Sequence, residues 1–263
     1  MTSQSSNCGK TDFKVPESNI ALIPARSGSI RVSGKNIRQL HGHPMIAYTI
    51  VSAIRSQLFS KIIVATDDPV TARIAQHYGV TDLFMRSSSI SGPTSIDFEW
   101  ISAIWDLGWL NSEYFTILRP TSPLRSISLI SQGFRNLLES KADSIRTVKK
   151  VKEHPGKMWS ILESGLMKPV MPQPTDGPAT HAMQYQGLPT TYVQTSVLEI
   201  ARTSVIPETS SREGTRIIPL ETFGQQNHAV DTEEDWDELL RLIALNPNSL
   251  IGIDADPFDF IRK

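Results

Sequence analysis

The chain has 263 residues, with 26 lysine and arginine against 27 aspartate and glutamate side chains, which gives a formal net charge of −1. This balance provides no global field that would attract nucleic acid or a membrane surface, so we expect neither as a partner. The single cysteine, Cys8, excludes a disulfide framework, and no apolar run approaches the length that spans a bilayer. We therefore expect a cytoplasmic protein, in which phosphate recognition comes from a local basic cluster.

Beyond residues 1–18, which are polar and which we interpret as a disordered tail, the first half of the chain alternates apolar runs with amphipathic segments. Apolar runs predict strands at 19–24, 61–66, 114–118 and 143–151. Apolar periodicity predicts helices at 44–54, 70–77, 98–105 and 127–138. Strand, loop and helix in repeated succession indicate an α/β fold, with a parallel sheet and helices on both faces. Ligands of such sheets bind beyond the carboxyl ends of the strands, where the polar loops of this chain fall.

The pattern changes after about residue 150. Residues 152–189 are rich in proline, glycine and methionine and show little helical periodicity. Strand-like segments follow at 192–201 and 215–220, and a last helix is expected at 233–245. Because the sheet-and-helix pattern resumes, we interpret the middle as an insertion into one domain over 19–245, followed by a C-terminal extension over 246–263.

The loop at residues 25–36, after the first strand, contains the parts of a triphosphate site. Arg26 can hold phosphate oxygens in a fork, and Lys35 supplies a point charge. Gly28 lets backbone amides approach a phosphate closely, while Ser29 and Asn36 can donate neutral hydrogen bonds. The loop is neither a Walker loop nor a dinucleotide fingerprint, because it lacks the required glycines and terminal Gly-Lys-Ser/Thr. Composition alone leaves a solvated basic loop as an equal alternative.

Six blocks of sequence, in order along the chain, resemble the CMP-sialic acid synthetase (acylneuraminate cytidylyltransferase) family. The blocks are IPARSGS (23–29) with KNI (35–37), GHPMIAYTI (42–50), VATDD (64–68), RPTSPLR (119–125), HPGKMW (154–159) and VDTEED (230–235). Each block is a weak signal alone, but together they extend over most of residues 20–240. The resemblance implies a mostly parallel, seven-stranded mixed sheet of the nucleotide-diphospho-sugar transferase kind, which is Rossmann-like. It also implies a homodimer, with residues at about 152–200 forming the dimer and facing the acceptor.

The activity that the resemblance implies is transfer of CMP from CTP to an acidic nonulosonic, sialic-acid-like sugar, with release of pyrophosphate, as in the synthesis of cell-surface polysaccharides. Arg26 and Lys35 would be the catalytic cations, because they would stabilise charge on the β- and γ-phosphates. Mg²⁺ would be the cofactor, held in part by Asp231. The implied nucleotide-binding residues are Ala25, Arg26, Gly28, Ser29, Asn36, Arg86, Arg119, Pro120 and Thr121. The implied sugar-facing residues are Gln184, Tyr185, Tyr192 and Gln194.

Four positions depart from the family pattern. Ile30 replaces a lysine, and Pro93 replaces an aspartate. Thr195 begins a Thr-Ser pair where the family commonly has Asn-Gly, and Ala229 replaces the first of two acids, which leaves Asp231. These departures motivate two alternatives: a catalytically weak or inactive paralogue that binds a nucleotide or a partner, and a cytidylyltransferase for a non-sugar acceptor such as a phosphonate.

Several acidic residues also have structural interpretations. Asp231 is as well explained as the N-cap of the last helix, with Glu234 completing a capping box, as it is by a metal-binding role. Asp67 and Asp68 are better explained as helix caps than as catalytic acids.

Overall fold

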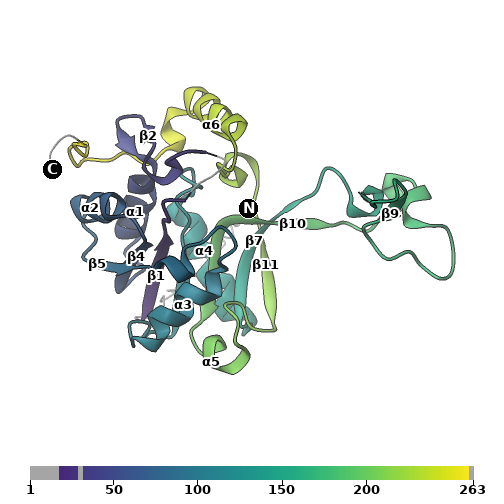
Figure 1. Cartoon of the computed structure of the whole chain (residues 1–263), viewed down its shortest axis with the longest axis horizontal. Coiled ribbons are helices and arrows are strands. Elements are labelled where there is room, and N and C mark those ends of the chain that lie inside the picture. Colours follow the sequence, from purple (N-terminus) through teal and green to yellow (C-terminus); the bar gives the residue numbers. More distant parts are fainter. Residues whose placement is uncertain (1–17, 29–31, 261–263) are drawn as a thin grey trace, which may run out of the picture.

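The computed structural model describes residues 18–28 and 32–260 (Figure 1). Seven strands form one sheet, in the order β11-β7-β10-β6-β1-β4-β5. Only β10 runs antiparallel to its neighbours, and the other adjacent pairs in this sheet are parallel, so the expected mostly parallel sheet is confirmed. The strands are β1 (Asn19–Pro24), β4 (Lys61–Thr66), β5 (Asp82–Met85), β6 (Tyr114–Ile117), β7 (Ser144–Lys150), β10 (Tyr192–Arg202) and β11 (Ile217–Glu221).

The central strand β1 is buried on both of its faces. Ile20 and Leu22 belong to one apolar cluster, and Ala21 and Ile23 belong to another on the opposite face. Alternate residues of a strand point to opposite faces, so a continuous apolar run is what a sheet covered on both sides requires. The sequence of this strand therefore indicates a position inside the sheet, and the structure places it between β6 and β4.

Helices cover both faces of the sheet, as expected. Helices α1 (Met45–Ser56), α2 (Pro69–His77) and α4 (Ile127–Ser140) contribute to the cluster on one face, and α3 (Asp97–Asp106) and α5 (Val205–Thr209) to the cluster on the other. The last helix, α6 (Glu233–Leu245), packs through Trp236 and Leu239 into a third cluster. This third cluster also contains Val32 and Val230, so it ties α6 to the loop that follows β1. None of the helices in residues 18–28 and 32–260 has the length and apolar character needed to cross a membrane.

The caps of two helices test the structural interpretation of the acidic residues. Asp68 caps α2, because its carboxylate accepts hydrogen bonds from the backbone amides of Val70 (3.1 Å) and Thr71 (2.8 Å). At α6 the expectation was wrong by one residue. Thr232 is the N-cap, and Asp235 completes the capping box.

The segment between β7 and β10 forms an arm that projects away from the sheet (Figure 1). Its outer part contains a hairpin of β8 (Trp159–Ile161) and β9 (Met167–Pro169). At its base, His154 accepts a hydrogen bond from the amide of Gly156 (2.9 Å), and its other ring nitrogen contacts the carbonyl of Pro189 (2.9 Å). The base of the arm is thus closed by hydrogen bonds, although its outer part packs on no element of the sheet.

The segment after α6 returns across α1 and α2. Arg55 of α1 donates to the carbonyl of Gly252 (2.7 Å) and forms an ion pair with Asp254. His77 of α2 contacts the carbonyl of Asp256 (2.7 Å), and its ring packs edge-on against Phe258. The described part of the C-terminal extension therefore belongs to the packed fold.

Candidate nucleotide-binding site

A cavity of about 260 Å³ lies beyond the carboxyl ends of β1, β5 and β6. Eight of the residues expected in the site line it together, namely Arg26, Lys35, Asn36, Arg86, Arg119, Pro120, Thr121 and Asp231. Pro24, Val32, Ser95 and Asp97 complete the lining. The carboxyl edge of parallel strands is where α/β sheets bind ligands, so the position agrees with the expectation from the strand pattern.

The loop after β1 is fixed by contacts with β4 and the residues that follow it. Ala25, which is fully buried, bonds to Ala65 through its amide (2.9 Å). Beyond β4, Asp67 accepts from the amide (2.7 Å) and the hydroxyl (2.9 Å) of Ser27. Asp67 was expected to share the capping of α2, but Asp68 alone caps that helix. Asp67 instead holds the loop after β1.

Of the two glycines in this loop, Gly34 and not Gly28 has a backbone conformation that favours glycine. Gly34 has φ of 59°, which is unfavourable for residues with a Cβ atom. A Cβ atom added at Gly28 would meet nothing within 4 Å among residues 18–28 and 32–260. Ser29, expected to bind phosphate, lies outside the described residues.

Lys35 connects the loop after β1 to the segment before α6. Its Nζ donates to the carbonyl of Val230 (2.8 Å) and to Oδ1 of Asp231 (3.0 Å). The lysine side chain is 13% exposed, so its charge is held at the cavity wall instead of in bulk water. The amide of Val230 in turn bonds to the carbonyl of Thr121 (2.9 Å). Loops that follow β1 and β6 are thereby joined around one cavity.

Two further cations come from the other walls. Arg26 donates through Nη1 to the carbonyl of Gly92 (2.6 Å). Arg86 is buried, lies over the ring of Trp100 at 5.4 Å and donates to the carbonyl of Ile90 (2.6 Å). Together with Lys35 and Arg119, these residues give the cavity four cationic side chains from three segments, the loop after β1, the residues after β5 and the turn after β6. A cluster of this kind is suited to the charges of a triphosphate.

Arg125 holds the turn after β6 in place through hydrogen bonds. This fully buried arginine donates to the carbonyl of Arg119 (2.7 Å) and to the carbonyl of Val197 in β10. Burial, with a smaller contribution from the charge of Arg119, lowers the pKa of Arg125 to about 9. The bonds place Pro120 and Thr121 at the cavity wall and attach the turn to β10.

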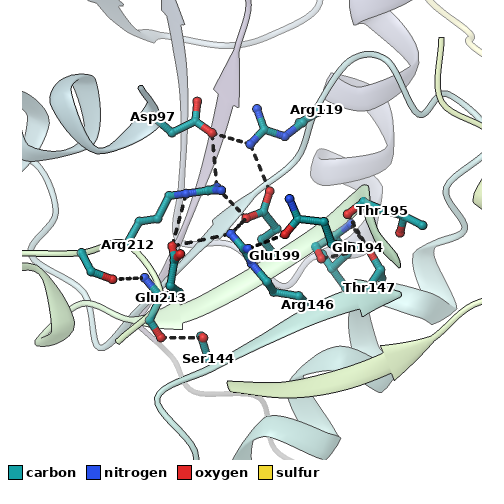
Figure 2. A network of polar contacts seen from close by, with 12 residues as sticks. Asp97, Arg119, Ser144, Arg146, Thr147, Gln194, Thr195, Glu199, Arg212 and Glu213 are labelled. Carbon is teal, nitrogen blue, oxygen red and sulfur yellow. Dashed lines mark hydrogen bonds and ion pairs between the residues drawn. The ribbon is translucent and has the colours of Figure 1, made fainter. Parts of the chain in front are cut away.

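Arg119 belongs to a network of alternating charges below the cavity (Figure 2). Its Nη2 donates to Asp97 (2.5 Å) and to Glu199 of β10 (3.0 Å). Glu199 also accepts from Arg146 of β7 (2.7 Å) and from Arg212 (2.5 Å). Glu213 extends the network to Arg146 and Arg212, at 3.5 Å and 3.4 Å. Three arginines are therefore matched by three carboxylates.

Because of Asp97, the free energy of unfolding is expected to fall at acidic pH. Burial alone would raise the pKa of Asp97, but the charges and hydrogen bonds of its partners, above all Arg119, lower it to about 2, against 3.8 in an exposed aspartate. A pKa depressed by folding adds stability that is present above pH 4 and is lost as pH falls from about 4 toward 2. The loss is roughly 2 kcal/mol of unfolding free energy.

Urea unfolding at pH 5 and pH 3 measures this effect, because Asp97→Asn removes the titrating group. The wild-type protein is expected to lose more stability between the two pH values than the variant does. Equal losses would contradict the assignment of the low pKa to Asp97.

The four residues expected to face a sugar do not line this cavity. Gln184 and Tyr185 lie on the arm, with Tyr185 beginning a single turn of 3₁₀-helix. Tyr192 begins β10, and Gln194 accepts a hydrogen bond from Arg146 (2.7 Å). Gln194 is thus attached to the charge network, and a sugar-facing role stays a prediction for all four residues, two on the arm and two on β10.

The departures from the family pattern occupy different surroundings. Pro93 follows the carbonyl that holds Arg26, and Ala229 precedes the segment that binds Lys35. Thr195 lies where the pairing of β10 with β7 shifts register, between Gln194 and Glu199. Ile30 lies outside the described residues.

The donor set of the cavity fits a metal ion that arrives with phosphate oxygens. In the described part of the chain, no three side chains from His, Cys, Asp and Glu group together as a metal site. Asp231 lines the cavity with a side chain that is 48% exposed, whereas Asp97 is engaged by arginines. One carboxylate is sufficient for Mg²⁺, which retains water ligands and binds substrate phosphates.

Sequence reasoning missed the members of the charge network other than Arg119 and Gln194. Asp97 begins a helix, Arg146 and Glu199 lie on two strands, and Arg212 and Glu213 lie in a loop. No short motif joins these five positions, because they meet only when β10 pairs with β7 and β6. The available signal was that two charged residues, Arg146 and Glu199, lie within strands expected to be buried.

Comparison with known proteins gives matches over most of the chain. Residues 20–160 match a family model described as cytidylyltransferase. The chain is 30% identical over 239 residues to the CMP-N,N'-diacetyllegionaminic acid synthase of Legionella pneumophila, covering 88% of this chain and 99% of that protein. It is 37% identical over 116 residues to the N-acylneuraminate cytidylyltransferase of Escherichia coli O18:K1:H7, covering 44% of this chain and 27% of that protein. The match thus spans about a quarter of one relative and nearly all of the other.

The fold is similar to that of solved nucleotidyltransferases. A CMP:2-keto-3-deoxy-manno-octonic acid synthetase in complex with CTP superposes with a TM-score of 0.62 at 14% identity, covering 87% of this chain and 99% of that one. At this identity the likeness concerns the fold alone, and it agrees with the sheet expected from the sequence.

Proposed function

Because this chain belongs to the cytidylyltransferase family, we propose that it transfers CMP from CTP to an acidic nonulosonic, sialic-acid-like sugar and releases pyrophosphate. The observation that carries the proposal is the cavity at the end of β1, where four cationic side chains converge. The Legionella pneumophila relative is named for a CMP-linked nonulosonic acid, and the alignment with it covers 88% of this chain. CTP is a cytoplasmic metabolite, so the cytoplasmic expectation is part of the proposal, as is a product destined for cell-surface polysaccharides.

The proposed reaction is an in-line attack of a sugar hydroxyl on the α-phosphate, in which the bond to the pyrophosphate leaving group breaks. Such transfers depend on positioning and on neutralisation of charge. Arg26 and Lys35 stabilise the charge that develops on the β- and γ-phosphates. Asn36, whose Nδ2 donates to the carbonyl of Arg26 (3.1 Å), keeps that arginine's backbone in place. The turn at Pro120 and Thr121 bounds the nucleotide on the side of β6.

Mg²⁺ is the proposed cofactor, and Asp231 is the side chain that would hold it. When bound, the ion neutralises phosphate charge and orients the oxygens of the triphosphate. Lys35 holds Asp231 at 3.0 Å, so the lysine orients the carboxylate toward the cavity.

A pyrophosphate-release assay tests the proposal. The purified protein is incubated with CTP, Mg²⁺ and sialic, legionaminic, pseudaminic or octulosonic acid, and each component is omitted in turn. Release is expected only when nucleotide, metal and one acidic sugar are all present. No release with any of these sugars would contradict the proposed acceptor class.

A second candidate is a cytidylyltransferase for a non-sugar acceptor such as a phosphonate. The observation that favours it is the register shift at Thr195, whose buried Oγ1 has no hydrogen-bond partner among the described residues. Adding phosphonates to the same assay separates the candidates. Binding of CTP without turnover would instead favour an inactive paralogue, in which Ile30→Lys combined with Ala229→Asp is expected to restore activity in part.

The homodimer is proposed to form through the arm. Ile161, Leu166 and Met167 are 78%, 68% and 56% exposed, although they gather at one hairpin and its turn. Burying one such side chain stabilises an interface by about 1.5–3 kcal/mol. In this arrangement the arm also brings Gln184 and Tyr185 to the site of the partner, which accounts for their distance from the cavity of their own chain.

Charges on the arm are expected to separate the dimer. Ile161→Asp combined with Leu166→Asp should raise the dimer dissociation constant by at least about 10²-fold, because apolar contact is lost and charge would be buried. Sedimentation velocity measures the change, with Leu245→Asp as a matched control, since Leu245 is 81% exposed on α6. A dimer that survives the arm substitutions would place the interface elsewhere.

A further inference from the structure

Glu199 is the centre of the charge network. Its carboxylate accepts hydrogen bonds from Arg119 (3.0 Å), Arg146 (2.7 Å) and Arg212 (2.5 Å), and its side chain is 12% exposed. The three arginines come from the turn after β6, from β7 and from the loop after α5 (Figure 2). One largely buried carboxylate therefore joins three segments that are distant in sequence.

The network lies where two cavities meet. A second cavity, of about 460 Å³, is lined by residues 95–98 and 210–213. It shares Ser95 and Asp97 with the cavity that holds the nucleotide in the proposed function. Asp97 is bound to Arg119 in the wall of the first cavity, at 2.5 Å, and to Arg212 in the wall of the second, at 3.2 Å.

In the proposed reaction, this shared edge offers an acceptor in the second cavity a route to a nucleotide in the first. The in-line geometry needs the acceptor hydroxyl and the α-phosphate to be placed precisely, because small displacements lower the rate strongly. Arg119 and Arg212 present their guanidinium groups at the two walls, and both are bound to the same carboxylate of Glu199. The distance between the guanidinium groups of Arg119 and Arg212 therefore depends on Glu199.

Neutralising Glu199 would leave three neighbouring arginines with only two carboxylates, Asp97 and Glu213. The three guanidinium groups carry like charges and would repel one another, because solvent and salt screen charges in such a site only weakly. The guanidinium of Arg119 would then be oriented by Asp97 alone. Arg212 would keep its contacts to Asp97 and Glu213, so the two walls would lose their common link.

We propose that Glu199 is a positioning residue for the acceptor, which holds Arg119 and Arg212 at the walls of two adjoining cavities. The second cavity receives a polar part of the acceptor, which contacts Arg212. This inference rests on the proposed function, since it requires a transfer reaction to an acceptor. Glu199 acts through the arginines and does not itself touch the reacting atoms.

Steady-state kinetics of Glu199→Gln test the inference, with Glu139→Gln as a matched control at an exposed position of α4. In Glu199→Gln, kcat/KM for the acceptor is expected to fall by about 10- to 100-fold, with a raised acceptor KM. The KM for CTP is expected to change by less than about threefold, because the other cationic side chains of the nucleotide cavity stay in place. Glu199→Asp, which keeps the charge, should recover part of the loss.

A structural role for Glu199 would give a different result. Loss of folded protein lowers the apparent kcat and leaves both KM values unchanged. The double variant Glu199→Gln with Arg146→Gln restores the balance of charge, and Arg146 lines neither cavity. If Glu199 positions the acceptor, the double variant folds as the wild type does but keeps the raised acceptor KM.

Two outcomes would overturn the inference, and they are distinguishable. A wild-type enzyme that turns over, together with an unchanged acceptor KM in Glu199→Gln and in the double variant, would remove the positioning role and leave the proposed function intact. A wild-type protein that transfers CMP to no acceptor would remove the proposed function, and the inference with it.

Discussion

Replacing Arg26 with alanine is expected to lower kcat/KM for CTP by about 10²- to 10³-fold, the usual effect of removing one donor from a preorganised site that stabilises developing charge. Arg26 is held at the cavity wall by its bond to the carbonyl of Gly92 (2.6 Å) and by the loop contacts of Asn36 and Asp67. Its guanidinium is thus placed before the nucleotide binds. Initial rates of pyrophosphate release at varied CTP measure the effect.

A matched control is Arg73→Ala, which removes an exposed arginine from α2 and is expected to leave the kinetics unchanged. Arg26→Lys should fall between the wild type and Arg26→Ala, because a lysine keeps the charge but cannot make a fork of two hydrogen bonds. If Arg26→Ala retained most of its kcat/KM for CTP, the cavity would not be the nucleotide site.

Lys35→Met is expected to lower kcat by about 10²-fold, with a smaller effect on the KM for CTP. The reason is that its charge acts mainly on the leaving pyrophosphate, where negative charge develops during the reaction. The substitution also removes the bonds to the carbonyl of Val230 and to Asp231, so the dependence of the rate on Mg²⁺ should shift to higher concentrations.

Lys61→Met provides the control for this substitution. Lys61 begins β4, at the end of the strand opposite the cavity, and forms an ion pair with Asp82 at 3.8 Å. Surface pairs of this kind contribute little to stability, so the control should behave as the wild type does. Equal losses in Lys35→Met and Lys61→Met would show that the loss does not arise from the phosphate site.

Most of the strands, and the loops at their carboxyl ends, could be predicted because each depends on local sequence, although β5, which precedes Arg86, was not expected. An uninterrupted apolar run such as 19–24 can be buried only in a sheet covered on both faces, and the polar residues that follow must then lie at its edge. The lining residues Arg26, Lys35 and Asn36 follow directly from this arrangement. The turn at 119–125 adds its residues for the same reason, since it follows another buried strand.

Features that depend on pairing between distant segments could not be predicted. The antiparallel direction of β10 follows from the arm that precedes it, and residue pattern carries no sign of strand direction. Asp67 was interpreted as a cap because it neighbours a helix, whereas its partner, Ser27, comes from 40 residues earlier. Glu199 reads as an isolated charge in an apolar strand until three arginines from other segments surround it.

The N-cap of α6 also differs from the interpretation of the sequence, by one residue. Both Asp231 and Thr232 can cap a helix, and the sequence alone does not decide between neighbours. The structure places Thr232 at the cap, and Asp231 lines the cavity beside Lys35. The acid that was open to two interpretations therefore lies with the cationic residues of the cavity.

Calorimetric titration of the protein with CTP, UTP, ATP and GTP in the presence of Mg²⁺ tests the central claim most directly. The claim is that the loop after β1, with Arg26 and Lys35, binds a nucleoside triphosphate. Saturable binding of CTP, preferred over the other nucleotides and strongly weakened in Arg26→Ala, is the predicted result. A folded protein with no affinity for any of these nucleotides would contradict it.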